Sequence, residues 1–83
     1  GLRSRIDFFN LSQTNLKHIE NGFFNTFQDL KQIHLEHNEL EFLKNYYFKN
    51  LTKLVRLNLA HNFLSSIDSY SFSNLNHLEY LDL

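Results

Sequence analysis

The sequence predicts an α/β solenoid, in which repeated units stack side by side and join their short strands into one parallel β-sheet. The main observation is a period of 24 residues, at which apolar side chains return along the chain. Three registers show this period: Ile33, Leu57 and Leu81; Leu35, Leu59 and Leu83; and Leu40 with Leu64. A fixed period of this size indicates a stacked array, because one unit cannot bury its apolar face without its neighbours.

The size of the chain is the second observation. A chain of 83 residues forms only a marginal closed core. We therefore expect a fragment of one longer array, with units at about 9–32, 33–56 and 57–80 and partial units on either side. The segment 1–5 is expected to be the remainder of a preceding unit or an artificial extension.

Each unit is expected to begin with a short strand. Apolar residues fill the first and third positions of segments 33–35 and 57–59, with a polar residue between them, which is the period of a half-buried strand. The same pattern restarts after a connection that is too long for a hairpin. The strands are therefore expected to run parallel and to form a ladder along one face.

An asparagine follows the strand in the second and third units, at Asn38 and Asn62. An amide side chain both donates and accepts hydrogen bonds, so stacked asparagines are expected to form a ladder with the backbone of adjacent turns. Thr14 takes this place in the first unit and supplies only a hydroxyl. We expect the ladder to be weaker there by about 1 kcal/mol, the net contribution of one hydrogen bond.

A phenylalanine recurs on the return segment of each unit, at Phe24, Phe48 and Phe72. Since each aromatic side chain buries about 150 to 250 Å², these rings are expected to stack as a spine beneath the convex face. The segments around them, 43–48 and 67–72, are expected to be irregular or to form short helical turns.

The segments 33–40 (IHLEHNEL) and 57–64 (LNLAHNFL) resemble the leucine-rich repeat signature. A phenylalanine followed by two leucines at steps of three residues, as in Phe48, Leu51 and Leu54, is similar to the 24-residue "typical" subclass of that family. The resemblance implies an arc with its parallel sheet on the concave face. Because this subclass is common in animal extracellular proteins such as Toll-like receptor ectodomains, it also implies an extracellular or cell-surface location.

The concave face holds the candidate binding residues, because side chains alternate across a strand and the neighbours of buried positions point outward. The candidates are Phe8, Asn10, Gln32, His34, Glu36, Arg56, Asn58, Tyr80 and Asp82. This mixture of aromatic, amide and charged groups suits a protein ligand, a co-receptor or a second copy in a homodimer, with Phe8, Arg56 and Tyr80 as anchors. The alternative is an ordinary solvated sheet face, with the binding site in other units.

Composition argues against several other classes. The net charge of −1 predicts no nucleic-acid partner, and a membrane contact is expected only through a segment outside this one, since no run approaches about 20 apolar residues. Neither a phosphate-binding loop nor a Ser-His-Asp set is present, so we predict no enzyme and no cofactor. His37 and His61 could share a zinc ion across adjacent strands, but a solvent-facing pair is preferred and no metal is predicted.

Two glycosylation sequons are present, Asn10-Leu11-Ser12 and Asn50-Leu51-Thr52. Asn50 is expected to be the better acceptor, because it lies on the return segment, whereas a glycan on Asn10 would shade the concave face. Together these features favour a protein-recognition module of an extracellular receptor, of the Toll-like or adhesion type. The alternatives are a secreted immune or matrix protein of the same architecture and a passive structural spacer.

Overall fold

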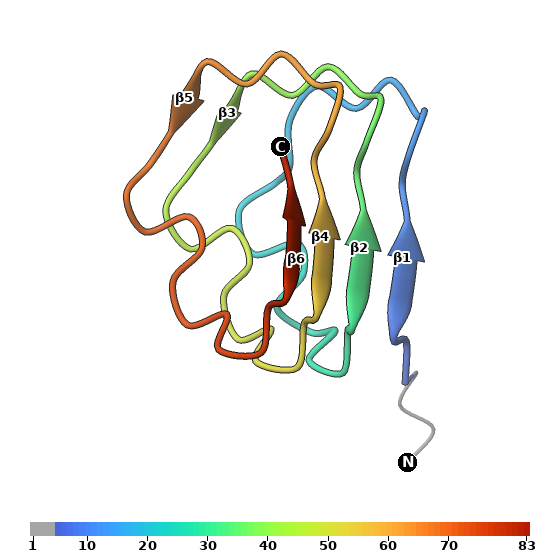
Figure 1. Cartoon of the computed structure of the whole chain (residues 1–83), viewed down its shortest axis with the longest axis vertical. Coiled ribbons are helices and arrows are strands. Elements are labelled where there is room, and N and C mark those ends of the chain that lie inside the picture. The colour runs from blue at the N-terminus through green and yellow to red at the C-terminus, as the bar shows by residue number, and fades with distance from the viewer. Residues whose placement is uncertain (1–4) are drawn as a thin grey trace.

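A computed structural model describes residues 5–83 as a coil of stacked turns with six short strands. A parallel sheet in the order β1-β2-β4-β6 contains β1 (Phe8–Asn10), β2 (Gln32–His34), β4 (Arg56–Asn58) and β6 (Tyr80–Asp82). A smaller parallel pair contains β3 (Phe42–Leu43) and β5 (Ser66–Ile67). Figure 1 shows the four-stranded sheet on one side of the coil and the return segments, with the smaller pair, on the other.

The register of the large sheet advances by one repeat from strand to strand. Phe8 pairs with Gln32, Gln32 with Arg56, and Arg56 with Tyr80. The predicted solenoid with a parallel sheet along one face is therefore confirmed. The return segments described in residues 5–83 consist of turns and contain no helix, so the irregular form of the expectation is the one observed. Of the segment 1–5, which we expected to be the remainder of a preceding unit or an artificial extension, residues 1–4 lie outside the described residues.

The core lies between the large sheet and the return segments. Its buried apolar side chains are Ile19, Phe24, Leu30, Ile33, Leu35, Leu40, Leu43, Tyr47, Phe48, Leu51, Leu54, Leu57 and Leu59. Most of them belong to the middle unit, 33–56, which has a complete unit on each side. This distribution is what stacking predicts, since each turn covers the apolar face of the next. Burial also raises the pKa of the Tyr47 phenol, and the Asp68 carboxylate raises it further.

The phenylalanine spine is present as predicted. The ring of Phe48 stacks on that of Phe24 at 5.7 Å between centroids and on that of Phe72 at 6.3 Å. Phe24 and Phe48 are fully enclosed, while Phe72 is half-buried. The rings therefore connect three successive turns through one continuous column of aromatic contacts.

The asparagine ladder is also present. Asn38 Oδ1 accepts hydrogen bonds from the backbone N–H groups of Thr14 at 3.0 Å and Leu16 at 2.9 Å. Asn38 Nδ2 donates to the carbonyl oxygen atoms of Leu11 at 2.9 Å and Leu35 at 3.0 Å. Each ladder amide thus satisfies backbone groups of its own turn and of the turn before it, which a buried backbone requires.

Thr14 ends this ladder. Its hydroxyl donates to the Leu11 carbonyl oxygen at 2.8 Å, which is the same bond within one turn that Asn62 makes to Leu59 at 2.9 Å. A hydroxyl cannot replace the remaining amide contacts. Thr14 therefore retains the bond to its own turn, and its backbone N–H is satisfied by Asn38.

Two features of the backbone were not predicted. Gln13, His37 and His61, which stand at the same place in successive turns, all have a left-handed backbone with φ between 55° and 58°. On the return side, a second ladder joins adjacent turns: Asn45 Oδ1 accepts from the Tyr70 N–H at 2.8 Å, and the Ser71 hydroxyl donates to the Leu43 carbonyl oxygen at 3.1 Å.

No helix in the described range is long and apolar enough to cross a bilayer.

Candidate functional site

The large sheet places all nine candidate residues on one surface. Eight of them lie in β1, β2, β4 and β6, and Glu36 follows β2 by two residues. The strand register aligns them in two rows: Phe8, Gln32, Arg56 and Tyr80, and then Asn10, His34, Asn58 and Asp82. The residues between these rows, such as Ile33 and Leu57, are fully buried. The alternation that the sequence predicted therefore separates this surface, called the concave face below, from the core.

Arg56 and Tyr80 form the clearest pair on the concave face. The guanidinium carbon of Arg56 lies 4.5 Å from the centroid of the Tyr80 ring, which is a cation–π contact. The Tyr80 side chain remains 50% exposed, so the pair is held in place and still accessible. An ordered arginine and a half-exposed aromatic ring are the side chains that protein interfaces use most often as anchors.

A second cluster lies around His34. Its ring is 5.0 Å from that of Phe8, its Nε2 is 3.1 Å from Gln32 Oε1, and its Nδ1 is 3.5 Å from Glu36 Oε2. Both ring nitrogens thus face oxygen atoms. The other carboxylate oxygen of Glu36, Oε1, is buried and has no hydrogen-bond partner among the described residues. These four side chains support one another, and only Phe8 among them is largely exposed.

The two asparagines of the second row have a structural task as well. Asn10 Oδ1 accepts a hydrogen bond from the Ser12 N–H at 3.1 Å, and Asn58 Oδ1 accepts one from the Ala60 N–H at 3.0 Å. Asparagine commonly closes a turn in this way. Their oxygen atoms therefore stabilise the ends of β1 and β4, and their amide NH₂ groups are the parts that a ligand would meet.

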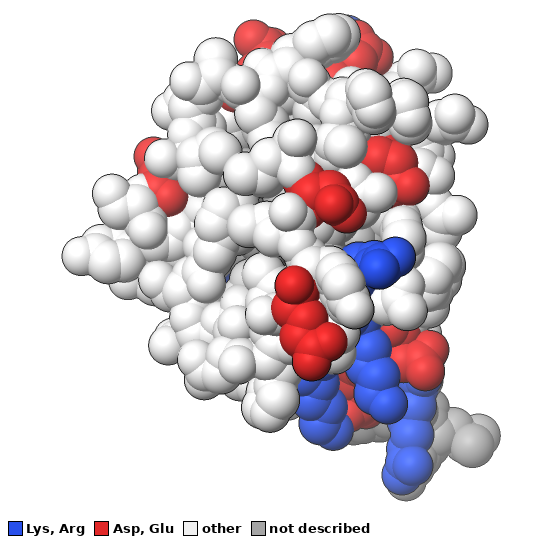
Figure 2. Space-filling view, in the orientation of Figure 1, with Lys and Arg blue, Asp and Glu red and all other residues white. Residues whose placement is uncertain are grey.

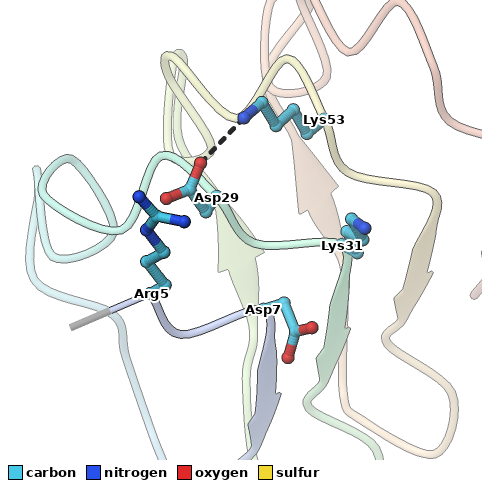
Figure 3. A pocket seen from close by; sticks show the side chains of 5 residues that line it. All are labelled: Arg5, Asp7, Asp29, Lys31 and Lys53. Atoms are coloured by element: carbon cyan, nitrogen blue, oxygen red, sulfur yellow. Dashed lines mark hydrogen bonds and ion pairs between the residues drawn. The ribbon is translucent and has the colours of Figure 1, made fainter.

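A charged hollow of about 460 Å³, which was not predicted from the sequence, borders the sheet where the strands begin. Its lining residues are Arg5, Asp7, Asp29, Lys31 and Lys53. Figure 3 shows Asp29 between Arg5 and Lys53, and Figure 2 shows the basic side chains gathered at this edge of the molecule. The sequence does indicate this cluster of charges, because residues 5, 29 and 53 are one repeat apart and alternate in charge.

Asp29 is the centre of this hollow. Lys53 Nζ donates to Asp29 Oδ1 at 2.8 Å. This hydrogen bond, followed by the charge of Lys53 and those of Arg5 and Lys31, lowers the pKa of the Asp29 carboxyl. Since the two carboxylates of the hollow offset most of its positive charge, it is better described as a region of mixed charge, with one ion pair between adjacent turns, than as an anion site.

His37 and His61 lie side by side at the upper end of the strands. Their rings are parallel to within 6° and 4.3 Å apart, and both side chains are exposed. In the described part of the chain, no three histidine, cysteine, aspartate or glutamate side chains come together in a group that could hold a metal ion. The two rings form a stacked pair that faces solvent.

The two sequons lie on opposite sides of the coil, and both asparagines are exposed. Asn10 belongs to β1 on the concave face, where the Ser12 hydroxyl donates to its Oδ1 at 2.6 Å. Asn50 lies in a turn of the return segment and has a left-handed backbone with φ of 68°. A glycan at Asn50 would leave the concave face open, whereas one at Asn10 would cover the β1 end of both rows.

Comparison with known proteins finds relatives that share this architecture. Residues 30–83 match the family model described as leucine rich repeat. The crystal structure of the TLR13–ssRNA13 complex, which contains a Toll-like receptor, is 33% identical to the chain and superposes with a TM-score of 0.87. The match covers 94% of this chain and 11% of that receptor chain, so the chain spans about a ninth of its solved relative. No curated protein matches the chain.

Proposed function

This chain belongs to the leucine-rich repeat family, and on that premise we propose that it is a protein-recognition module of an extracellular cell-surface receptor, of the Toll-like or adhesion type. Its repeats would be units 9–32, 33–56 and 57–80, which is supported by the register of the sheet. Its concave face would bind a protein ligand, a co-receptor or a second copy of the receptor. The observation that carries this proposal is the ordered, accessible pair of Arg56 and Tyr80 at the β4–β6 end of the outward rows.

A protein partner suits this surface better than a nucleic acid. The solved relative is a complex with ssRNA, but here the carboxylates of Glu36 and Asp82 share the concave face with Arg56. Figure 2 shows acidic as well as basic side chains on the face that it presents. A continuous line of phosphates would meet these carboxylates, since nucleic-acid affinity comes mainly from pairing phosphates with cations. A protein surface can offer both charges.

Replacing Arg56 and Tyr80 together by alanine is expected to weaken binding by at least about 2 kcal/mol, because anchors of these types contribute most of an interface's energy. The measurement is surface plasmon resonance of the intact ectodomain against the protein ligand that the unmodified ectodomain captures. Tyr70→Ala is the matched control, since Tyr70 is an exposed tyrosine on the opposite side of the coil. Unchanged binding in the double variant, with folding intact, would instead support a spacer or a site in other units.

The extracellular assignment predicts that Asn50 carries a glycan when the protein is made in a secretory host. Intact-mass and peptide mass spectrometry should show a modified Asn50, and Asn50→Gln should remove that modification without changing the circular dichroism spectrum, because the side chain is exposed. A bare Asn50 would count against an extracellular location. The same expression separates the alternatives, since a secreted immune or matrix protein would be released into the medium without a membrane anchor.

A further inference from the structure

The return side of the coil carries a column of tyrosines with one member missing. Tyr46 and Tyr70 stack at 5.9 Å between ring centroids and 4° from parallel, and both are about half exposed. One repeat before Tyr46, the same position is Gly22. Figure 1 shows that the return turns lie one behind another, away from the large sheet. The column therefore ends at Tyr46, with no side chain where the next ring would lie.

A hollow of about 310 Å³ occupies this place. It is lined by Asn21, Gly22, Asn25, Asn45, Tyr46 and Lys49. Its size is at the lower limit of ligand pockets, roughly 300 Å³, which suits one small ring-shaped ligand. A Cβ atom on Gly22 would come to 3.2 Å from Asn25 Nδ2, so glycine keeps the space beside Tyr46 open.

The lining offers hydrogen-bond donors. Among residues 5–83, none of the three asparagine Nδ2 groups of the hollow donates a hydrogen bond, and Lys49 forms no ion pair. Asn45 Oδ1 is already occupied by the Tyr70 N–H, and Asn25 Oδ1 is buried with no partner in the same part of the chain. No carboxylate lines the hollow. A ligand with several oxygen acceptors and one negative charge would therefore complement it.

We propose that this hollow binds one acidic sugar unit, such as a uronic or sialic acid. The apolar face of the sugar would stack on the Tyr46 ring, in the place that a third tyrosine would fill. Its hydroxyl and ring oxygen atoms would accept hydrogen bonds from the asparagine amides, and its carboxylate would pair with Lys49. A planar aromatic ligand would fill the same gap but would leave these donors without partners, which costs binding energy.

The hollow is separate from the concave face, so its test is independent of the proposed receptor function. The intact protein, labelled with ¹⁵N, is titrated with glucuronic acid and with N-acetylneuraminic acid in two-dimensional NMR spectra. Glucose and inorganic phosphate serve as the neutral and the simple-anion probes. We expect saturable shifts confined to the amides around Gly22 and Tyr46, with a Kd of about 1 mM for an acidic sugar.

Matched variants assign the contacts. Tyr46→Ala should weaken binding of the acidic sugar roughly tenfold, while Tyr70→Ala, an exposed tyrosine outside the hollow, should weaken it much less. Lys49→Gln should remove the preference over glucose, while Lys17→Gln, which changes an exposed lysine outside the hollow, should leave it unchanged. The proposal is overturned if no sugar gives saturable shifts, if phosphate binds as well as the acidic sugars, or if Tyr46→Ala has no effect in a folded protein.

Discussion

Replacing Phe48 by alanine should lower the free energy of unfolding by about 3 to 5 kcal/mol, the usual range for deleting a buried phenylalanine side chain. Phe48 is 1% exposed and lies in the middle of the aromatic spine, with Phe24 at 5.7 Å and Phe72 at 6.3 Å. Its loss would remove ring contacts on both sides and leave a cavity between two turns. Both turns are held by backbone hydrogen bonds to their neighbours, so they can close only part of that cavity.

Urea denaturation followed by circular dichroism measures this loss. The urea concentration at the midpoint of unfolding should fall, while the slope of the unfolding free energy against urea concentration stays nearly constant. This combination marks a change in stability without a change in the surface exposed on unfolding. Phe48→Leu, which keeps most of the volume, should lose less than about 1.5 kcal/mol. Tyr70→Ala removes an exposed ring and should lose clearly less than Phe48→Ala. A loss below about 1 kcal/mol for Phe48→Ala would show that the spine contributes little to stability.

The period of the sequence was sufficient to predict most of the fold and the arrangement of the concave face. Once apolar residues repeat at a fixed interval, parallel strands must pair in that register, and the outward rows follow from alternation along each strand. This is why Phe8, Gln32, Arg56 and Tyr80, which follow one another at intervals of 24 residues, lie in one row. The contact of Arg56 with Tyr80 was not predicted, because it depends on the rotamers of two side chains rather than on their register.

Features that depend on backbone geometry could not be predicted in the same way. β3 and β5 contain two residues each, too few to show a periodic pattern. The left-handed turn at His37 and His61 has no glycine to mark it. Two other features could have been predicted from the sequence, since both are visible when residues 24 positions apart are compared. They are the alternating charges around Asp29 and the glycine that interrupts the tyrosine column at Gly22.

Replacing Asn38 by alanine should lower the free energy of unfolding by about 3 kcal/mol, since two backbone N–H groups would lose their partner at once and each costs about 1 to 3 kcal/mol when left unsatisfied. Asn38 is 4% exposed, and its amide bonds the N–H groups of Thr14 and Leu16 and the carbonyl oxygen atoms of Leu11 and Leu35. The carbonyl oxygen atoms of Leu11 and Leu35 also accept hydrogen bonds from the Thr14 hydroxyl and from Asn62 Nδ2. The groups left without a partner are therefore the N–H groups of Thr14 and Leu16.

Two further variants identify the cause of this loss. Asn58→Ala deletes the same amide from an accessible strand end, where it accepts one hydrogen bond from Ala60, so it should cost only about 1 kcal/mol. Asn38→Asp keeps the acceptor but directs a second oxygen atom at the carbonyl oxygen atoms of Leu11 and Leu35, so it should also destabilise strongly. If Asn38→Asp were as stable as the unmodified protein, the ladder would need only the acceptor, and the amide donors would be dispensable. If Asn38→Ala and Asn58→Ala lost the same free energy, burial of the ladder amide would not be what stabilises the stack.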